Sequence, residues 1–318
     1  MRKILFHIGL PKTATTFLQY QIFYPSTSIK VIHKKKNTPF LRKILKVIYQ
    51  EKKEPLTIPN TTIQLCQKMF GEENVAFVLS HENISMQPHS IWTNEKAPNA
   101  DDIAHNLYTL ANRAFNQDDQ ISILLTIRRQ DTWMASRYAQ SGLFFPNPGQ
   151  KDFVERIYAL LDSDIMENLP WLAYASVYKS LSKYFSQENI HCFMQEELLQ
   201  HPEKAISALD QRLGVNSMLK SLDKYQKTTQ KKANCRSISP NIWQVKDTDK
   251  TIELTKELSR HILSKFQEEN RQLYDLFGID GSPYGYFQKN TLDQKRTELK
   301  KSAFKLKNIQ NQLWKYQN

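Results

Sequence analysis

The chain has 318 residues, of which 40% are hydrophobic, and it carries a formal net charge of +12. No run approaches the ~18 consecutive apolar residues of a transmembrane helix, and the three scattered cysteines fit neither a disulfide framework nor a zinc site. The length suits one large α/β domain, with or without an appendage.

The chain opens with a strand, a turn and a helix that together suit an anion. The apolar run from Ile4 to Ile8 predicts a buried strand over residues 3–8, a tight turn follows at Gly9, and apolar periodicity predicts a helix over 15–24. Free backbone N–H groups and the positive end of a helix dipole would face a phosphate there. The turn with its lysine is therefore a candidate phosphate loop, Pro11-Lys12-Thr13-Ala14-Thr15-Thr16.

This loop differs from the nucleoside-triphosphate P-loop, in which two glycines separated by four residues precede the lysine and the Ser/Thr that holds magnesium. Here the loop is shorter, and no second glycine precedes Lys12. We expect no metal at the site. The short loop argues against a nucleotide or sugar kinase, which is the competing enzyme hypothesis.

A strand over 28–33 leads into the first of two basic segments. Residues 34–54 contain eight Lys/Arg against two Glu, and Thr38-Pro39 predicts a helix start. Apolar residues from Phe40 to Ile48 occupy one side of this helix, and basic residues occupy the other. Such a basic amphipathic insert, about residues 34–55, either lies on an anionic membrane or packs on the domain.

A helix over 60–70 precedes a strand over 74–80, which ends in His81-Glu82-Asn83. Placed at the carboxyl end of its strand, this trio would face the same crevice as Lys12. Side chains alternate along an extended chain, so only one of His81 and Glu82 is expected to point inward.

After a helix over 101–115, the apolar strand 120–127 runs into Arg128, and a helix over 130–141 carries Ser136. An arginine at the carboxyl end of a central strand lies where α/β sheets bind ligands. The guanidinium fork and a serine hydroxyl two helical turns later suit a terminal phosphate.

The remaining chain predicts helical structure over 152–185, a strand over 189–195 and mainly helices afterwards. Alternating strands and helices predict an α/β fold in which helices wrap a parallel sheet. The second basic segment, residues 289–318, has eight Lys/Arg against two acidic residues and a leucine at every seventh position. It predicts a basic amphipathic tail over 287–318 that binds an anionic surface, packs on the domain or dimerises.

The loop pattern and the Arg128-x7-Ser136 spacing resemble the two phosphate motifs of the sulfotransferases that use 3′-phosphoadenylyl sulfate (PAPS). Weaker likeness continues to about residue 286. The resemblance implies a P-loop-like three-layer α/β/α domain over 1–286 and sulfuryl transfer from PAPS, which leaves 3′,5′-adenosine diphosphate (PAP). Ala14 stands where this family usually has glycine, which can adopt positive φ more easily.

The resemblance also assigns roles. Lys12 would neutralise charge on the leaving phosphate and the sulfuryl oxygens, Glu82 would act as general base with His81 as second candidate, and Arg128 with Ser136 would bind the 3′-phosphate. The other cofactor-binding candidates are Pro11, Thr13, Ala14, Thr15, Thr16, Phe17, Lys232 and Arg236.

The sequence therefore predicts a cytoplasmic sulfotransferase that acts on a hydroxyl of a glycan or glycolipid. We expect no nucleic-acid partner, because the charge outside the two basic segments sums to zero. Contact with the inner membrane face and homo-oligomerisation are alternative uses of the basic segments. A non-catalytic basic adaptor is the competing hypothesis of a different class.

Overall fold

The structure is a computed structural model that describes residues 1–51, 57–71, 75–85, 91–92, 97–227 and 237–287. A five-stranded sheet in the order β2-β3-β1-β4-β5 forms its centre, and every neighbouring pair of strands is parallel. The strands are β1 (Lys3–His7), β2 (Ile29–His33), β3 (Ala76–Ser80), β4 (Gln120–Ile127) and β5 (Ile190–Met194).

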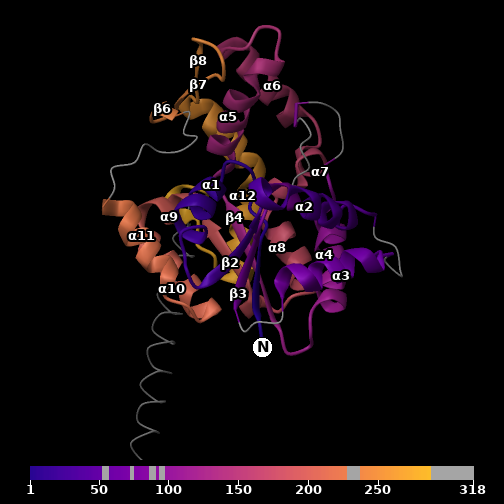
Figure 1. Cartoon of the computed structure of the whole chain (residues 1–318). Helices are drawn as coiled ribbons and strands as arrows, with labels where there is room; N and C mark the ends of the chain where they lie inside the picture. Colours follow the sequence, from indigo (N-terminus) through magenta and orange to yellow (C-terminus); the bar gives the residue numbers. More distant parts are fainter. Residues whose placement is uncertain (52–56, 72–74, 86–90, 93–96, 228–236, 288–318) are drawn as a thin grey trace, which may run out of the picture.

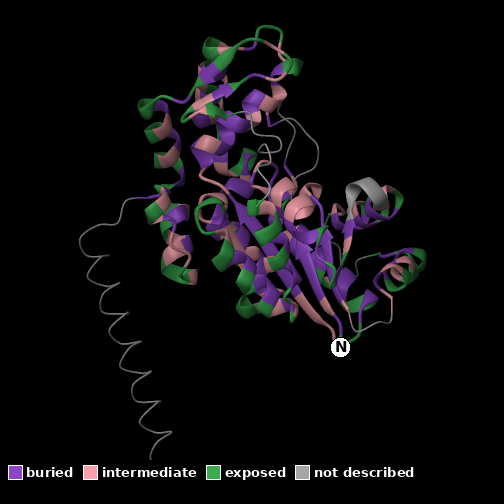
Figure 2. Cartoon of the chain, turned by 60° about the vertical axis from the view of Figure 1, so that its left-hand side comes forward, coloured by how far each residue is buried: buried purple, intermediate pink, exposed green. Residues whose placement is uncertain are grey.

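Alternating side chains of the central strands enter two separate cores. Ile4 and Phe6 of β1 belong to the larger core, whereas Leu5 between them belongs to the smaller one on the opposite face. Both faces of the sheet are therefore covered, which makes a three-layer α/β/α fold of the expected class. Figure 2 shows the sheet largely buried, with exposed residues on the outer sides of the helices.

The helices that pack against the larger core cover one side of the sheet, called the larger face. Those that pack against the smaller core cover the other side, the smaller face (Figure 1). The larger face holds α2 (Lys34–Ile48), α3 (Asn60–Phe70), α4 (Ala100–Ala114), α5 (Gln130–Ser141), α8 (Tyr174–Ser182) and α12 (Lys256–Phe277). The smaller face holds the π-helical turn η1 (Leu18–Phe23), α9 (Gln195–Gln200), α10 (Pro202–Leu213) and α11 (Ser217–Lys227).

Beyond the carboxyl ends of the strands lies a smaller lobe, at the top of Figure 1. It contains α6 (Gln150–Asp162) and an antiparallel sheet of β6 (Ser237–Ser239), β7 (Ile242–Gln244) and β8 (Thr251–Glu253). The lobe is joined to α5 by a hydrogen bond from Lys246 N to the carbonyl of Ala139 (2.7 Å). The smaller lobe is thus attached to α5, beyond the carboxyl edge of the central sheet.

Two parts of the predicted element pattern are wrong. The expected helical stretch 152–185 is divided into α6, α7 (Ile165–Asn168), the 3-10 turn η4 (Pro170–Leu172) and α8, because Asp164 caps a new helix and Pro170 cannot continue α7. The three short strands β6–β8 were expected to be helical, and strands of three residues carry almost no periodic signal.

The basic amphipathic helix packs on the domain. Asn37 has non-helical dihedral angles (φ −123°, ψ 27°) and interrupts α2 directly before the predicted helix start at Thr38-Pro39. The apolar side of α2 is buried in the larger core, and its basic side is exposed. The buried residues are Phe40, Leu41, Ile44, Val47 and Ile48, and the exposed ones are Arg42, Lys43 and Lys46.

Across the described residues, every helix is too short or too polar to cross a membrane. The predicted basic tail lies outside the described residues except for Phe287, which is buried in the larger core.

Candidate active site

The predicted phosphate loop follows β1 and is held against β4 by its backbone. Leu10 N donates a hydrogen bond to the carbonyl of Thr126 (3.3 Å). Lys12 (φ 69°) and Ala14 (φ 63°) both adopt the left-handed conformation, which turns the chain into α1 (Thr15–Phe17) and then η1. Ala14 thus adopts the backbone geometry that glycine adopts more easily, at a conformational cost of about 1 kcal/mol.

Gly9 permits this close approach of the loop to the sheet. A Cβ atom at position 9 would lie 1.6 Å from Thr126 Oγ1 and 3.0 Å from His7 Nε2. Neither neighbour is a flexible chain end, so any larger residue would displace the loop from β4.

The two predicted phosphate motifs contact each other directly. Trp133 Nε1 donates to the carbonyl of Pro11 (2.7 Å), and Arg128 Nη1 donates to the carbonyl of Lys12 (3.3 Å). Arg128 Nε also donates to Thr132 Oγ1 (3.0 Å), which fixes the guanidinium at the start of α5. Two carbonyl groups of the loop therefore accept hydrogen bonds from the β4–α5 segment.

Arg129, the neighbour of Arg128, has a structural role. Its guanidinium pairs with Asp131 (2.7 Å), and its backbone N–H donates to Glu196 Oε1 (3.1 Å). Asp131 is buried and also accepts from Ser259 Oγ (2.6 Å) on α12. This network ties α5 to α9 and α12 and leaves Arg128 as the arginine that faces the loop.

A buried polar cluster underlies the loop. His7 Nδ1 lies 2.7 Å from Ser80 Oγ, and Ser80 also accepts from Gln19 Nε2 (3.0 Å). Thr13 Oγ1 lies 2.7 Å from Thr126 Oγ1 and donates to the carbonyl of Leu10 (2.6 Å). Burial lowers the pKa of His7 to about 3, so its imidazole is neutral and acts as a hydrogen-bonding support. The Thr13 hydroxyl is used within the protein.

The two candidate bases have different surroundings. His81 is buried, and its Nδ1 accepts a hydrogen bond from Asn83 N (3.0 Å) at the start of the 3-10 turn η2 (Glu82–Ile84). Glu82 is partly exposed, and its Oε2 accepts from Thr15 Oγ1 (3.4 Å) in the phosphate loop. Glu82 thus contacts the phosphate loop.

The remaining predicted residues fall into three groups. Ser136 is buried on α5 and makes no side-chain hydrogen bond to the described residues, while Thr16 is partly exposed next to Thr15. Phe17 packs edge-on against Tyr225 of α11, with ring centroids 5.3 Å apart. Lys232 and Arg236 lie outside the described residues.

Sequence reasoning missed Trp133, Thr126 and Tyr225 as parts of the site. Trp133 belongs to the predicted second motif, and a buried indole N–H usually finds a hydrogen-bond acceptor. Thr126 is a polar residue in a largely apolar strand, which was a usable signal. Nothing in the sequence pattern pairs Tyr225 with Phe17.

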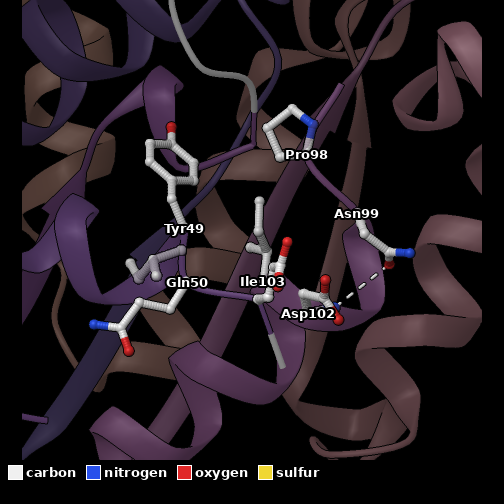
Figure 3. A pocket seen from close by; sticks show the side chains of 8 residues that line it. Tyr49, Gln50, Pro98, Asn99, Asp102 and Ile103 are labelled. Atoms are coloured by element: carbon white, nitrogen blue, oxygen red, sulfur yellow. Dashed lines mark hydrogen bonds between the residues drawn. The ribbon is translucent and has the colours of Figure 1, made fainter. Parts of the chain in front are cut away.

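A small pocket between the end of α2 and the start of α4 is unsuited to a phosphosulfate (Figure 3). Glu51 and Asp102 contribute carboxylates to its lining, and Asn99 caps α4 by accepting from Asp101 N and Asp102 N. None of its lining residues belongs to the two phosphate motifs. Among the described residues, no group of three acidic, histidine or cysteine side chains converges as a metal-binding cluster.

The solved structures to which this chain is similar include sulfotransferases. The chain is similar to a sulfotransferase from Alicyclobacillus acidocaldarius, with a TM-score of 0.50 and 15% identity over 88% of this chain and 97% of that one. It is also similar to mouse SULT7A1 in complex with PAP, with a TM-score of 0.38 and 13% identity over 87% of this chain and 82% of that one.

A third structure is the sulfotransferase domain of the Synechococcus PCC 7002 olefin synthase, with a TM-score of 0.35 and 13% identity over 87% and 95% of the two chains. No protein-family model and no curated protein sequence matches the chain. The likeness to the Alicyclobacillus protein establishes the sulfotransferase fold for this chain.

Proposed function

We propose that this protein is a PAPS-dependent sulfotransferase that transfers a sulfuryl group to a hydroxyl of a glycan or glycolipid. The observation that carries the proposal is the direct contact between the two phosphate motifs: Trp133 and Arg128 bind the carbonyls of Pro11 and Lys12. The lysine-bearing loop and Arg128 are thereby held together at the carboxyl edge of the sheet.

The residues present fit PAPS. Lys12 and Ala14 have left-handed backbone angles, and turns of this kind can present backbone N–H groups to an anion. The N–H groups of the loop, with the Thr16 hydroxyl, would hold the 5′-phosphate. Arg128 and Ser136 would hold the 3′-phosphate. Phe17 and Tyr225 supply aromatic surface on the η1–α11 side for the adenine. When bound, PAPS supplies an activated sulfuryl group on a phosphate leaving group.

Lys12 and Glu82 would have different catalytic roles. Lys12 would stabilise the negative charge that develops as the sulfuryl group transfers, as cationic groups do in phosphoryl transfer. Glu82 would take the proton of the acceptor hydroxyl, and its contact with Thr15 supports this role. His81 is disfavoured as the base because its Nδ1 already accepts a backbone N–H.

Ligand-induced thermal stabilisation tests the cofactor class. PAP at 100 times its Kd should stabilise the protein by about 2.7 kcal/mol, whereas ATP with magnesium should not stabilise it specifically. Stabilisation by ATP with magnesium alone would favour a kinase. No response to either ligand would favour the non-catalytic adaptor.

The Lys12→Ala variant tests the catalytic assignment. Turnover should fall by at least about 10²–10³-fold because the lost charge acts mainly in the transition state. PAP should still bind. The matched control is Lys43→Ala, which removes an exposed lysine of α2 and should leave turnover unchanged. Near-normal turnover of the Lys12 variant would refute the assigned role.

The base assignment is tested by comparing Glu82→Gln with His81→Ala. The Glu82 variant should lose about 10²–10⁴-fold in turnover with PAP affinity intact, and the His81 variant should lose less. The reverse order would move the base to His81. Activity that survives both changes would place the base elsewhere.

A further inference from the structure

One face of α5 leads from the phosphate loop toward the upper lobe. Trp133, Arg137 and Gln140 follow helical spacing, and Phe144 lies one turn further, in the 3-10 turn η3 (Gly142–Phe144). Trp133 contacts the loop at Pro11, so this face begins at the proposed cofactor site. Phe144 at its far end is 77% exposed.

Arg137 is the charged residue on this face, and its guanidinium is only partly used by the protein. Nη1 donates to Gln140 Oε1 (3.0 Å), and the group lies 5.9 Å from the ring centroid of Trp133. Nε is buried and has no hydrogen-bond acceptor among the described residues. The residue as a whole is partly exposed.

The electrostatic surroundings of Arg137 link it to the candidate base. Burial lowers the pKa of Arg137, and the negative charge of Glu82 acts in the opposite direction. Within the described part of the chain, no carboxylate forms an ion pair with Arg137, which separates it from Arg129 and Arg156 with their partners Asp131 and Asp152. Arg137 therefore lies near Glu82 without being neutralised by direct contact.

Such an arrangement is costly for the protein alone. A buried N–H group of a charged side chain without an acceptor loses its hydration without compensation. A ligand that brings a carboxylate would supply the missing acceptors in the bidentate geometry that arginine favours.

We propose that Arg137 binds a carboxylate of the acceptor, so that the acceptor is an anionic sugar of the uronic acid type. The proposal rests on the proposed function, because it assumes an acceptor hydroxyl at Glu82. A uronic acid carries a carboxylate and hydroxyls on one ring, and this matches a cation and a base close together. The exposed ring of Phe144 offers a surface for the apolar face of a neighbouring sugar.

A matched pair of acceptors tests the proposal. One is an oligosaccharide of alternating glucuronate and N-acetylglucosamine, and the other is the same oligosaccharide with its carboxylates reduced to alcohols. Transfer from labelled PAPS is measured with both, and kcat and KM are determined. The wild-type protein should prefer the carboxylate form by about 10- to 100-fold in kcat/KM.

Variants then assign that preference to one residue. Arg137→Gln should bring the ratio of kcat/KM values for the two acceptors close to one, mainly through KM. Arg137→Lys should keep part of the preference, because it retains the charge and loses the fork. Arg260→Gln, an exposed arginine on α12, controls for net charge and should keep the full preference. PAP-induced thermal stabilisation confirms that each variant is folded.

The outcomes separate this proposal from the one on which it rests. Equal activity on both acceptors, or transfer to neither while PAP binds, overturns the carboxylate proposal and leaves PAPS use standing. An Arg137→Gln variant that loses both activities equally, with a shifted pH profile of kcat, overturns it in favour of a positioning role on Glu82. Absence of PAP binding in the wild type refutes the proposed function itself.

Discussion

Arg128 and Arg129 follow one another in the chain, yet their guanidinium groups have different partners. Arg128 donates to the carbonyl of Lys12 and to Thr132, whereas Arg129 pairs with the buried Asp131. The first contact joins the two phosphate motifs, and the second joins α5 to its neighbours. We therefore expect Arg128 to affect ligand binding and Arg129 to affect the stability of the fold.

Replacement of each arginine by alanine should show this separation. Arg128→Ala should weaken PAPS binding by about 1.5–3 kcal/mol and hardly change the binding of adenosine 5′-phosphosulfate, which lacks the 3′-phosphate. Arg129→Ala should instead lower the free energy of unfolding by about 3–5 kcal/mol, because Asp131 would remain buried without its partner. Calorimetric titration and chemical unfolding measure the two effects. Equal losses of both ligands in the Arg128 variant would make Arg128 structural.

His7 should make the protein acid-sensitive. Its pKa is lowered to about 3 by burial, and an unperturbed histidine has a pKa of about 6.5. Between these values the unfolded chain binds a proton that the folded chain does not. The free energy of unfolding should therefore fall as the pH falls below about 6.5, by up to about 1.4 kcal/mol per pH unit from this residue.

The measurement compares wild type with His7→Asn, which keeps a polar group near Ser80 and does not titrate in this range. The difference between their unfolding free energies should shrink as the pH falls from 7 toward 4. A constant difference would mean that the pKa of His7 is the same in the folded and the unfolded chain.

At the residue scale, the sequence is enough to name Lys12 and Arg128 as candidate anion-binding groups, because charge and position along the chain suffice. It does not give the contacts that orient them. The preference for Glu82 over His81 gains support from three dimensions, because Glu82 contacts Thr15 and His81 Nδ1 accepts from Asn83 N. The role of Arg137 depends on Gln140 and Glu82 in three dimensions, which no short motif expresses.

At the scale of elements, the loop, β1 and β4 form one packed unit. Gly9 provides the space in which the loop crosses Thr126, and Thr126 in turn contacts Thr13. The effects of substitutions at Gly9 and Thr126 should therefore be energetically coupled.

A double-mutant cycle of Gly9→Ala and Thr126→Ala tests this coupling. Gly9→Ala alone should lower stability by about 1–3 kcal/mol through overpacking and weaken PAP binding, because the loop is displaced. Thr126→Ala removes the Oγ1 that lies 1.6 Å from the added Cβ, so the double variant should recover part of the loss. Chemical unfolding and PAP titration of all four proteins give the coupling energy. Strictly additive effects would show that the two residues do not interact.

The sequence predicts β1, β3, β4 and α5 well, because buried parallel strands are continuous apolar runs and α5 begins directly after one. It fails for β6–β8 and for the breaks around α7. Those elements are short and are stabilised by tertiary contacts, such as that of Gln150 on α6 with the backbone of Glu253 on β8 (2.6 Å). Local patterns carry no information about such pairings.

At the scale of the whole molecule, the excess positive charge lies in two segments, of which the structure describes most of the first. The apolar side of α2 is part of the core, so this helix presents only a basic ridge. The described chain ends with Tyr286 and Phe287, both buried, and Asn270 Nδ2 donates to the carbonyl of Tyr286 (3.1 Å). A deletion that begins at residue 288 therefore spares the packed domain.

We propose that the basic segment of residues 288–318 holds the protein near an anionic surface, as the membrane face where glycolipids are assembled would provide. The segment has a net charge of +6, with Trp314 and Tyr316 near its end. Each basic residue contributes at most about 1 kcal/mol near an anionic leaflet, and aromatic residues favour the interface.

Co-sedimentation with anionic liposomes at low and high salt, for the full chain and for the deletion variant, tests this proposal. Binding by the full chain should weaken as salt screens the charges and should disappear in the variant. PAP-induced stabilisation should be the same in both, because Tyr286 and Phe287 are retained. A variant with half the solution mass would show that the leucine stripe dimerises instead. Binding that persists in the variant would assign the contact to the basic ridge of α2, and a Lys43→Gln, Lys46→Gln double substitution would then abolish it.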